Sequence, residues 1–258
     1  MAKAKKVGGG KCSAGARSQF MPTRVSNLDK AIDKRGLERG SAILLSGDTG
    51  TGKSLFALQS AYNAALKGEK VAYFSLEEEP QDIKRRVLNS FGWDLGALEK
   101  KGVLAIQKVS PNDMARSIEG RLKERGIEQV IEGLEKVRLE AREITMPFRP
   151  DMVVIDPVSA LMPSFSDHAK YRTYLGILFD SLRNYGSVNL MISEAKPEAY
   201  SRAGVEEYLA DGVISFHSVK KNGGRAHALE IVKLRFSGHT KKLIPFDIGK
   251  KGIRISLR

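Results

Sequence analysis

The chain has 258 residues, of which 41% are hydrophobic and 28% charged, enough for one large α/β domain with a core of its own. The single cysteine, Cys12, excludes an internal disulfide, and the four scattered histidines exclude a zinc site of the common Cys/His type. No apolar run approaches the length of a bilayer span, so we expect a soluble, cytoplasmic protein with no membrane partner.

The net charge of +13 is concentrated at the two ends of the chain. Residues 1–24 carry six basic side chains and no acidic one, and residues 218–258 carry eleven basic side chains against Glu230 and Asp247. These ends could bind a nucleic acid or an acidic protein partner. They could equally be a solubilising tail and a set of phosphate-binding residues, and composition leaves both interpretations open.

Residues 1–20 offer almost nothing apolar to bury and are predicted to be a disordered basic tail, followed by one domain at 21–258. The domain begins with a predicted short helix at 28–32, a turn at 36–40, a strand at 42–45 and a helix from Leu55 that stops at Gly68. Strands at 71–76, 103–109, 152–155 and 188–192 then alternate with helices at 81–91, 113–125, 127–144 and 171–184. Residues 92–95 are expected to end the helix at 81–91.

The pattern changes from Gly212 onward, where predicted strands follow one another at 213–219, 228–236, 242–246 and 252–257. Alternating strands and helices predict an α/β fold with a central, mostly parallel sheet flanked by helices. The consecutive strands predict a C-terminal antiparallel β extension of that sheet.

One stretch joins a predicted strand to a predicted helix and fits the phosphate-binding pattern G-x-x-x-x-G-K-[ST]. Its glycines let several backbone N–H groups converge on phosphate oxygens at the positive end of a helix. Lys53 would reach the β and γ phosphates, and the Ser54 hydroxyl would bind Mg²⁺. We therefore expect nucleotide binding by Gly47, Asp48, Thr49, Gly50, Thr51, Gly52, Lys53 and Ser54.

Acidic residues end two of the predicted strands. Asp156 follows the apolar strand at 152–155, where ligands of open α/β sheets bind, and could hold the metal or Ser54. Glu77 and Glu78 follow the strand at 71–76, and a carboxylate there could orient and deprotonate a water that attacks the γ-phosphate. Adjacent side chains of a strand point opposite ways, so at most one of the pair is expected to face the phosphate. A solvated acidic turn remains the alternative.

Basic side chains recur near the C-terminus. Lys233 and Arg235 lie two apart in a predicted strand and so share one face, and His239 follows the Ser237-Gly238 turn. They could reach a phosphate held by a neighbouring copy. From these residues alone, an ordinary charged edge strand is the simpler interpretation.

Several more segments follow in a fixed order: Leu55-Phe56 after the phosphate loop, the paired glutamates within 76–83, and the segments 90–95, 153–156 and 204–211. The C-terminal part adds 229–235, His239, Pro245-Phe246 and Gly252-Ile253. Together, from about Met21 to Ile255, these segments resemble the KaiC family of RecA-like ATPases.

The resemblance implies a RecA-like P-loop NTPase fold, the ligands ATP and Mg²⁺, and a homo-oligomeric ring, commonly a hexamer, with ATP between subunits. It implies that Glu77 and Glu78 are the catalytic pair and that Ser54 and Asp156 serve the metal. Leu55 joins the residues that bind the nucleotide. Contacts to nucleotide held by the adjacent subunit are implied for Lys233, Leu234, Arg235, Ser237 and His239.

Three departures from the family pattern narrow the resemblance to a single-domain, KaiC-like prokaryotic protein, archaeal in type. The family's clock proteins carry two such domains in tandem, whereas this chain has one. No Ser or Thr here is followed directly by another, so the clock proteins' adjacent phosphorylation pair has no counterpart and autokinase activity is not expected. Phe236 stands where the family usually has glycine.

Three functions stay open. The first is an ATP hydrolase, and the second is a nucleotide-gated assembly scaffold with negligible turnover. The third is a DNA-binding, recombinase-related ATPase, which the basic ends favour. The loops at 163–170 and 196–207 offer few aromatic side chains on which bases could stack, since only Phe165, Tyr200 and the nearby Tyr171 are available.

Overall fold

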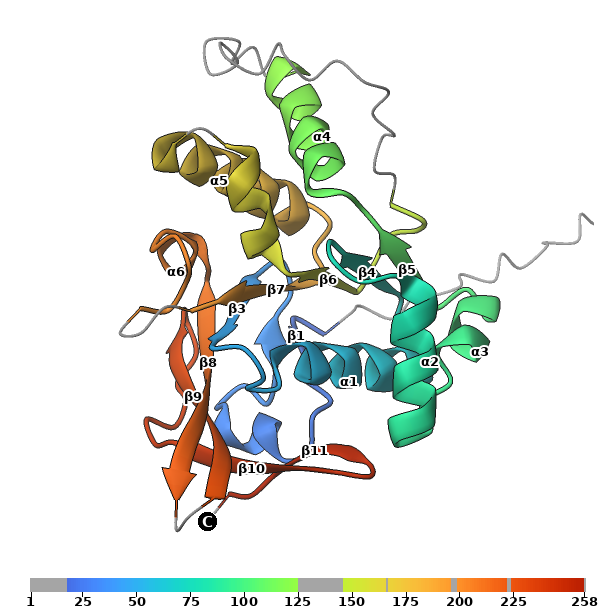
Figure 1. Cartoon of the computed structure of the whole chain (residues 1–258), viewed down its shortest axis with the longest axis vertical. Helices are drawn as coiled ribbons and strands as arrows, with labels where there is room; N and C mark the ends of the chain where they lie inside the picture. The colour runs from blue at the N-terminus through green and yellow to red at the C-terminus, as the bar shows by residue number, and fades with distance from the viewer. Residues whose placement is uncertain (1–17, 125–145, 166, 196–198, 222–223, 258) are drawn as a thin grey trace, which may run out of the picture.

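The computed structural model describes residues 18–124, 146–165, 167–195, 199–221 and 224–257 (Figure 1). Residues 1–17 of the predicted tail and the predicted helix at 127–144 lie outside the described residues. No helix of the described ranges is long and apolar enough to cross a membrane.

A nine-stranded sheet forms the centre of the molecule. Its parallel part consists, in spatial order, of β8 (Gly212–Lys221), β3 (Ala42–Gly47), β7 (Val188–Glu194), β6 (Met152–Asp156), β4 (Val71–Ser75) and β5 (Leu104–Lys108). The antiparallel strands β9 (Gly224–Leu234), β10 (Ile244–Gly249) and β11 (Gly252–Ile255) continue the sheet beyond β8. The mixed sheet predicted from the sequence is therefore confirmed.

Helices cover both faces of this sheet, as Figure 1 shows. One face packs against α1 (Lys53–Leu66), α2 (Pro80–Phe91) and α3 (Leu95–Lys100), and the other packs against α4 (Pro111–Glu124) and α5 (His168–Arg183). Along β3, Ile43 and Leu45 join the first core while Ala42 and Leu44 join the second, because successive side chains of a strand point to opposite faces. Burial on both faces explains the continuous apolar runs of the central strands.

The predicted break after the helix at 81–91 is confirmed, since α2 ends at Phe91 and Gly92 takes a left-handed conformation with φ 72°. Helix α3, which follows directly, was not predicted: Asp94 caps it, and its carboxylate accepts a hydrogen bond from the Ala97 N–H at 2.9 Å. The expected turn at 36–40 contains a short strand, β2 (Leu37–Glu38), which pairs with β1 (Phe20–Met21). Phe20 thus belongs to the folded domain, although composition places it in the tail.

The predicted strand at 228–236 also ends differently. It begins earlier, at Gly224, and stops at Leu234, which pairs with Gly212, the first residue of β8. Beyond that point β8 has no residue left to pair, and Phe236 leaves the extended conformation with φ 59°. Arg235 therefore lies in a turn and not on the face of the strand that carries Lys233. Short helices η1 (Leu28–Ala31), η3 (Val158–Ser164) and α6 (Glu206–Leu209) complete the described elements.

Candidate nucleotide-binding site

The predicted phosphate loop joins β3 to α1 at the carboxyl edge of the parallel strands. Gly47 has φ 147° and Gly52, which caps the helix, has φ 98°, a left-handed conformation that favours glycine. A Cβ on Gly47 would also lie 2.4 Å from the carbonyl oxygen of Phe216 on the adjacent strand β8. The loop therefore needs glycine at both positions, and its amides lie at the N-terminus of α1, where an anion is favoured.

Lys53 is buried at the first position of α1. Its ammonium donates hydrogen bonds to the carbonyl oxygens of Gly47 at 2.9 Å and Asp48 at 2.8 Å, so the side chain curls back over the loop. Burial lowers the pKa of Lys53, and the acidic Glu194, Asp156 and Asp48 oppose that shift. The loop thus holds a cation among carboxylates at the point where phosphate is expected.

Asp156 ends β6, and its two carboxylate oxygens have different partners. The Ser54 hydroxyl donates to Oδ1 at 3.2 Å, and the Tyr73 hydroxyl, from β4, donates to Oδ2 at 2.5 Å. Burial raises the pKa of Asp156, the two hydroxyl donors lower it, and the charges of Glu78 and Glu77 raise it again. Burial and the Asp156 charge also raise the pKa of Tyr73 well above its ordinary value, so the phenol stays protonated as a donor.

The paired glutamates follow β4 at the same edge and are exposed. Glu78 forms an ion pair with Arg86 of α2, with Nη2 and Oε2 2.8 Å apart, and its backbone N–H donates to the Ser75 hydroxyl at 3.0 Å. The Glu77 backbone carbonyl accepts from the Lys108 ammonium, and no hydrogen bond or ion pair holds the Glu77 carboxylate within the described ranges. The charges of Glu77 and Glu78 both raise the pKa of Asp156, as expected for carboxylates at the same edge of the sheet.

Two residues of this edge were missed by sequence reasoning. Glu194 ends β7, lies level with Gly47 in the sheet, and is the largest electrostatic influence opposing the burial of Lys53. Like Asp156, Glu194 comes at the end of a buried parallel strand, and this pattern could have identified it from the sequence. Tyr73 lies within the apolar strand 71–75 and has no such signal.

A cavity of about 730 Å³ adjoins the loop on the side of β8 and β9. Its walls come from the loop residues Gly47, Asp48, Thr49 and Thr51, and from Tyr200, His217 and Glu230 beyond them. The His217 ring and the Glu230 carboxylate form a pair at 3.1 Å within this wall. The phosphate loop therefore opens onto a space large enough for a ligand.

The second predicted set of nucleotide contacts lies elsewhere. Leu234 pairs with Gly212, and Gly212 pairs with Ile43 near the start of β3, whereas the phosphate loop follows the end of β3. The six residues of β3 span about 17 Å at about 3.3 Å per residue. The structure thus brings Ser54, Asp156 and the paired glutamates together at one edge, and it places Lys233, Leu234, Arg235, Ser237 and His239 at the opposite edge.

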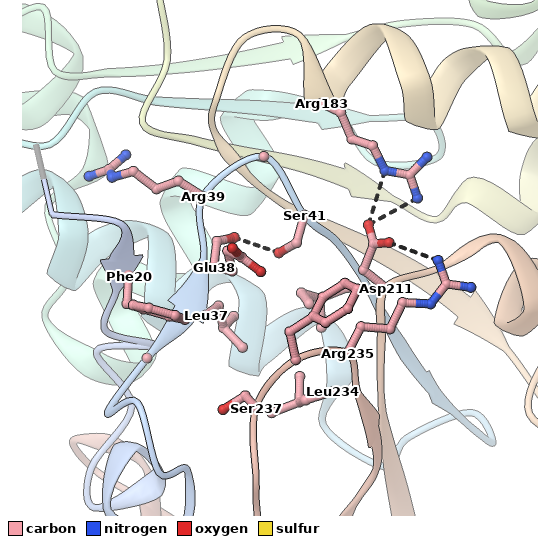
Figure 2. A pocket seen from close by; sticks show the side chains of 14 residues that line it. Phe20, Leu37, Glu38, Arg39, Ser41, Arg183, Asp211, Leu234, Arg235 and Ser237 are labelled. Atoms are coloured by element: carbon pink, nitrogen blue, oxygen red, sulfur yellow. Dashed lines mark hydrogen bonds and ion pairs between the residues drawn. The ribbon is translucent and has the colours of Figure 1, made fainter.

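Figure 2 shows that opposite edge, where Arg183 of α5 and Arg235 converge on Asp211. Arg183 Nη2 lies 2.9 Å from Asp211 Oδ2, and Arg235 Nη1 lies 3.2 Å from Oδ1. The Lys233 ammonium donates to the Glu207 carbonyl at 2.8 Å, and partial burial together with the Arg235 charge lowers the pKa of Lys233. A cavity of about 270 Å³ lies between this cluster and β2.

Known proteins resemble the chain over most of its length. A family model for the KaiC ATPase matches residues 21–258. The circadian clock oscillator protein KaiC of Synechococcus elongatus is 33% identical over 239 residues, which are 91% of this chain and 44% of that protein. KaiC of Parathermosynechococcus lividus is 33% identical over 227 residues, which are 87% of this chain and 40% of that protein. The chain spans less than half the length of these curated relatives.

A solved structure agrees with the sequence comparisons. The crystal structure of a KaiC-like protein from the hyperthermophilic archaeon Pyrococcus horikoshii OT3 matches with a TM-score of 0.74 and 29% sequence identity. The match covers 92% of this chain and 99% of the archaeal one. With its mostly parallel sheet, its phosphate loop and its antiparallel C-terminal strands, this chain belongs to the KaiC family of ATPases.

Proposed function

We propose that the chain is a Mg²⁺-dependent ATP hydrolase that binds its nucleotide between two copies of itself in a homo-oligomeric ring. The observation that carries this proposal is the separation of the two predicted sets of nucleotide contacts on opposite edges of one sheet. A single chain cannot bring both sets to one nucleotide, because they lie at opposite edges of the sheet. In a ring, the edge that carries the phosphate loop in one copy can face the edge that carries Arg235 in the next copy.

At the loop edge, the backbone N–H groups and Lys53 bind the phosphates. Lys53 already points over the loop, and phosphate oxygens replace the carbonyl oxygens of Gly47 and Asp48 as its partners. Because a phosphate is a charged acceptor, this exchange strengthens the hydrogen bonds of the ammonium. The Glu194 carboxylate opposes the lowering of the Lys53 pKa by burial and so favours the charged ammonium.

The Ser54 hydroxyl and the Asp156 carboxylate fit a site for Mg²⁺. Both are hard oxygen donors, and they already lie 3.2 Å apart. Mg²⁺ keeps several waters and is usually held by one or two carboxylates together with substrate phosphates, so one hydroxyl and one carboxylate suit it. When bound, Mg²⁺ supplies charge neutralisation at the β and γ phosphates.

At the same edge, we assign the activation of the attacking water to Glu77. Its carboxylate has no ion pair among the described residues, whereas that of Glu78 is engaged by Arg86. Glu78 therefore positions the segment and Glu77 accepts the proton from water. Arg235 of the next copy in the ring, supported by Lys233, stabilises the charge that develops on the γ-phosphate.

Steady-state ADP release at a high protein concentration tests this proposal, because the three adjacent glutamates supply matched variants. We expect Glu77→Gln to lower kcat by about a hundredfold or more, the usual size of a general-base contribution. Glu78→Gln should lower it less, and Glu79→Gln, which alters an exposed ion pair with Lys108, should leave it near wild type. Wild-type protein that releases no ADP above background would instead support the nucleotide-gated scaffold.

A further inference from the structure

Phe236 is 89% exposed, more than any other large apolar side chain in the described ranges. It also has φ 59°, and it is the only aromatic residue with a positive φ among those ranges. Bulky side chains rarely adopt this conformation, which costs conformational free energy. Within one copy of the chain, Phe236 lines the cavity beside β2 but stays 89% exposed, so little burial of its ring offsets this cost.

The turn that carries Phe236 is firmly held at both ends. Before it, the Arg235 backbone N–H donates to the Asp211 carbonyl at 2.9 Å. After it, the Gly238 carbonyl accepts from the Asp33 N–H at 3.0 Å, and His239 forms a β-bridge with Ile32. The ring is therefore displayed by a fixed turn and does not hang from a loose loop, as an interface anchor requires.

Charge identifies the surface that this turn suits. Near Phe236 in the sequence lie the basic residues Lys233, Arg235, Lys241 and Lys242, and the acids Glu38 and Asp211 line the same cavity as Phe236. At the phosphate-binding edge, Asp48, Glu77, Glu78 and Glu79 are exposed, and Arg86 and Lys108 pair with Glu78 and Glu79. Basic side chains outnumber acidic ones in the first set and acidic side chains outnumber basic ones in the second, so the two edges have opposite net charge when one copy is placed against another.

We propose that Phe236 is the apolar anchor of the contact between copies, with its ring packed against protein atoms at the phosphate-binding edge of a second copy. The inference rests on the proposed function, which places Arg235 and Ser237 on either side of it at the neighbour's nucleotide. Exposed aromatic rings that become buried on association dominate the energetics of many interfaces. Contact with the neighbour offsets the cost of the strained turn.

Sedimentation velocity with Mg·ATP tests the anchor. Phe236→Gly should raise the protein concentration at half-assembly at least tenfold, and Phe236→Leu, which keeps an apolar side chain, should recover most of the assembly. The unassembled Phe236→Gly subunit should melt no lower than wild type, because glycine accepts φ 59° without strain. Leu66→Ala, which trims an apolar side chain that is 54% exposed at the end of α1, should assemble normally.

A photoreactive p-benzoylphenylalanine in place of Phe236 identifies what the ring touches. Cross-linking to a peptide from the phosphate-binding edge of another copy supports the anchor. Transfer to radiolabelled ATP alone would place the ring on the adenine and overturn it. Assembly that Phe236→Gly leaves at the wild-type level would overturn only the anchor. ATP hydrolysis by a wild type that never assembles would overturn both the ring and the anchor.

Discussion

The two edges of the central sheet differ in how far one chain completes them. At the phosphate-binding edge, polar groups already have partners: Lys53 is bonded to two loop carbonyls, and Asp156 accepts from Ser54 and Tyr73. At the opposite edge, Arg235 and Phe236 are exposed on a fixed turn. In the proposed function, the first edge binds the phosphates within one subunit, and the second edge acts only against a neighbouring copy.

This difference has a kinetic consequence. A change at the phosphate-binding edge acts on a single subunit, so it should impair binding at any protein concentration. A change at the opposite edge acts only when copies meet, so it should impair turnover in the assembled state and spare nucleotide binding by isolated subunits. Variants of the two edges can therefore distinguish effects on nucleotide binding by one subunit from effects on turnover by the assembled protein.

The largest effect is expected for Lys53→Ala. The loss of a buried cation beside Asp48, Asp156 and Glu194 removes the main positive charge available to the phosphates. ATP binding by dilute subunits, followed by fluorescence of a labelled ATP, should fall at least a hundredfold, and turnover should be lost. Lys67→Ala on the exposed end of the same helix is the matched control and should bind normally. Intact ATP binding by Lys53→Ala would show that this loop is not the phosphate site.

A smaller and more selective effect is expected for Arg235→Ala. Asp211 keeps its ion pair with Arg183, so the fold of this edge should survive the substitution. We expect kcat of the assembled protein to fall by about a thousandfold, the lower end of the effect of an arginine supplied in trans. ATP binding by dilute subunits should be unchanged, and equal losses of binding and turnover would contradict the separation of the two edges.

The smallest effect concerns the pH profile. In the proposed site, Asp156 binds metal in its ionised form; burial raises its pKa, and the Tyr73 hydrogen bond lowers it. Tyr73→Phe removes a donor to the charged form, so the pKa of Asp156 should rise further. The acidic limb of the kcat/KM profile should move to higher pH by about one unit, because a hydrogen bond to a charged group contributes about 1.5 kcal/mol and one pKa unit is about 1.4 kcal/mol. Tyr62→Phe is the control, and an unmoved acidic limb would contradict this role of Tyr73.

The two edges also differ in how well the sequence predicts them. The phosphate loop is contiguous, and Asp156 and the paired glutamates end apolar strands, so local pattern and the geometry of parallel sheets locate them. Tyr73 was missed because its neighbours in β4 are apolar, and only the pairing of β4 with β6 brings its hydroxyl to Asp156. The proposed trans role of Arg235 rests on family resemblance, since in one chain it is a basic residue paired with Asp211.

Activity in mixtures of two variants tests most directly whether the nucleotide site is shared between copies. Lys53→Ala removes the phosphate-binding edge and Arg235→Ala the opposite edge, and each alone should be nearly inactive. If copies share the site, mixed assemblies contain some interfaces in which an intact loop meets an intact Arg235, so ADP release should rise well above that of either variant, towards about a quarter of wild type for random mixing at equal amounts. ADP release equal to the average of the two variants would contradict a shared site.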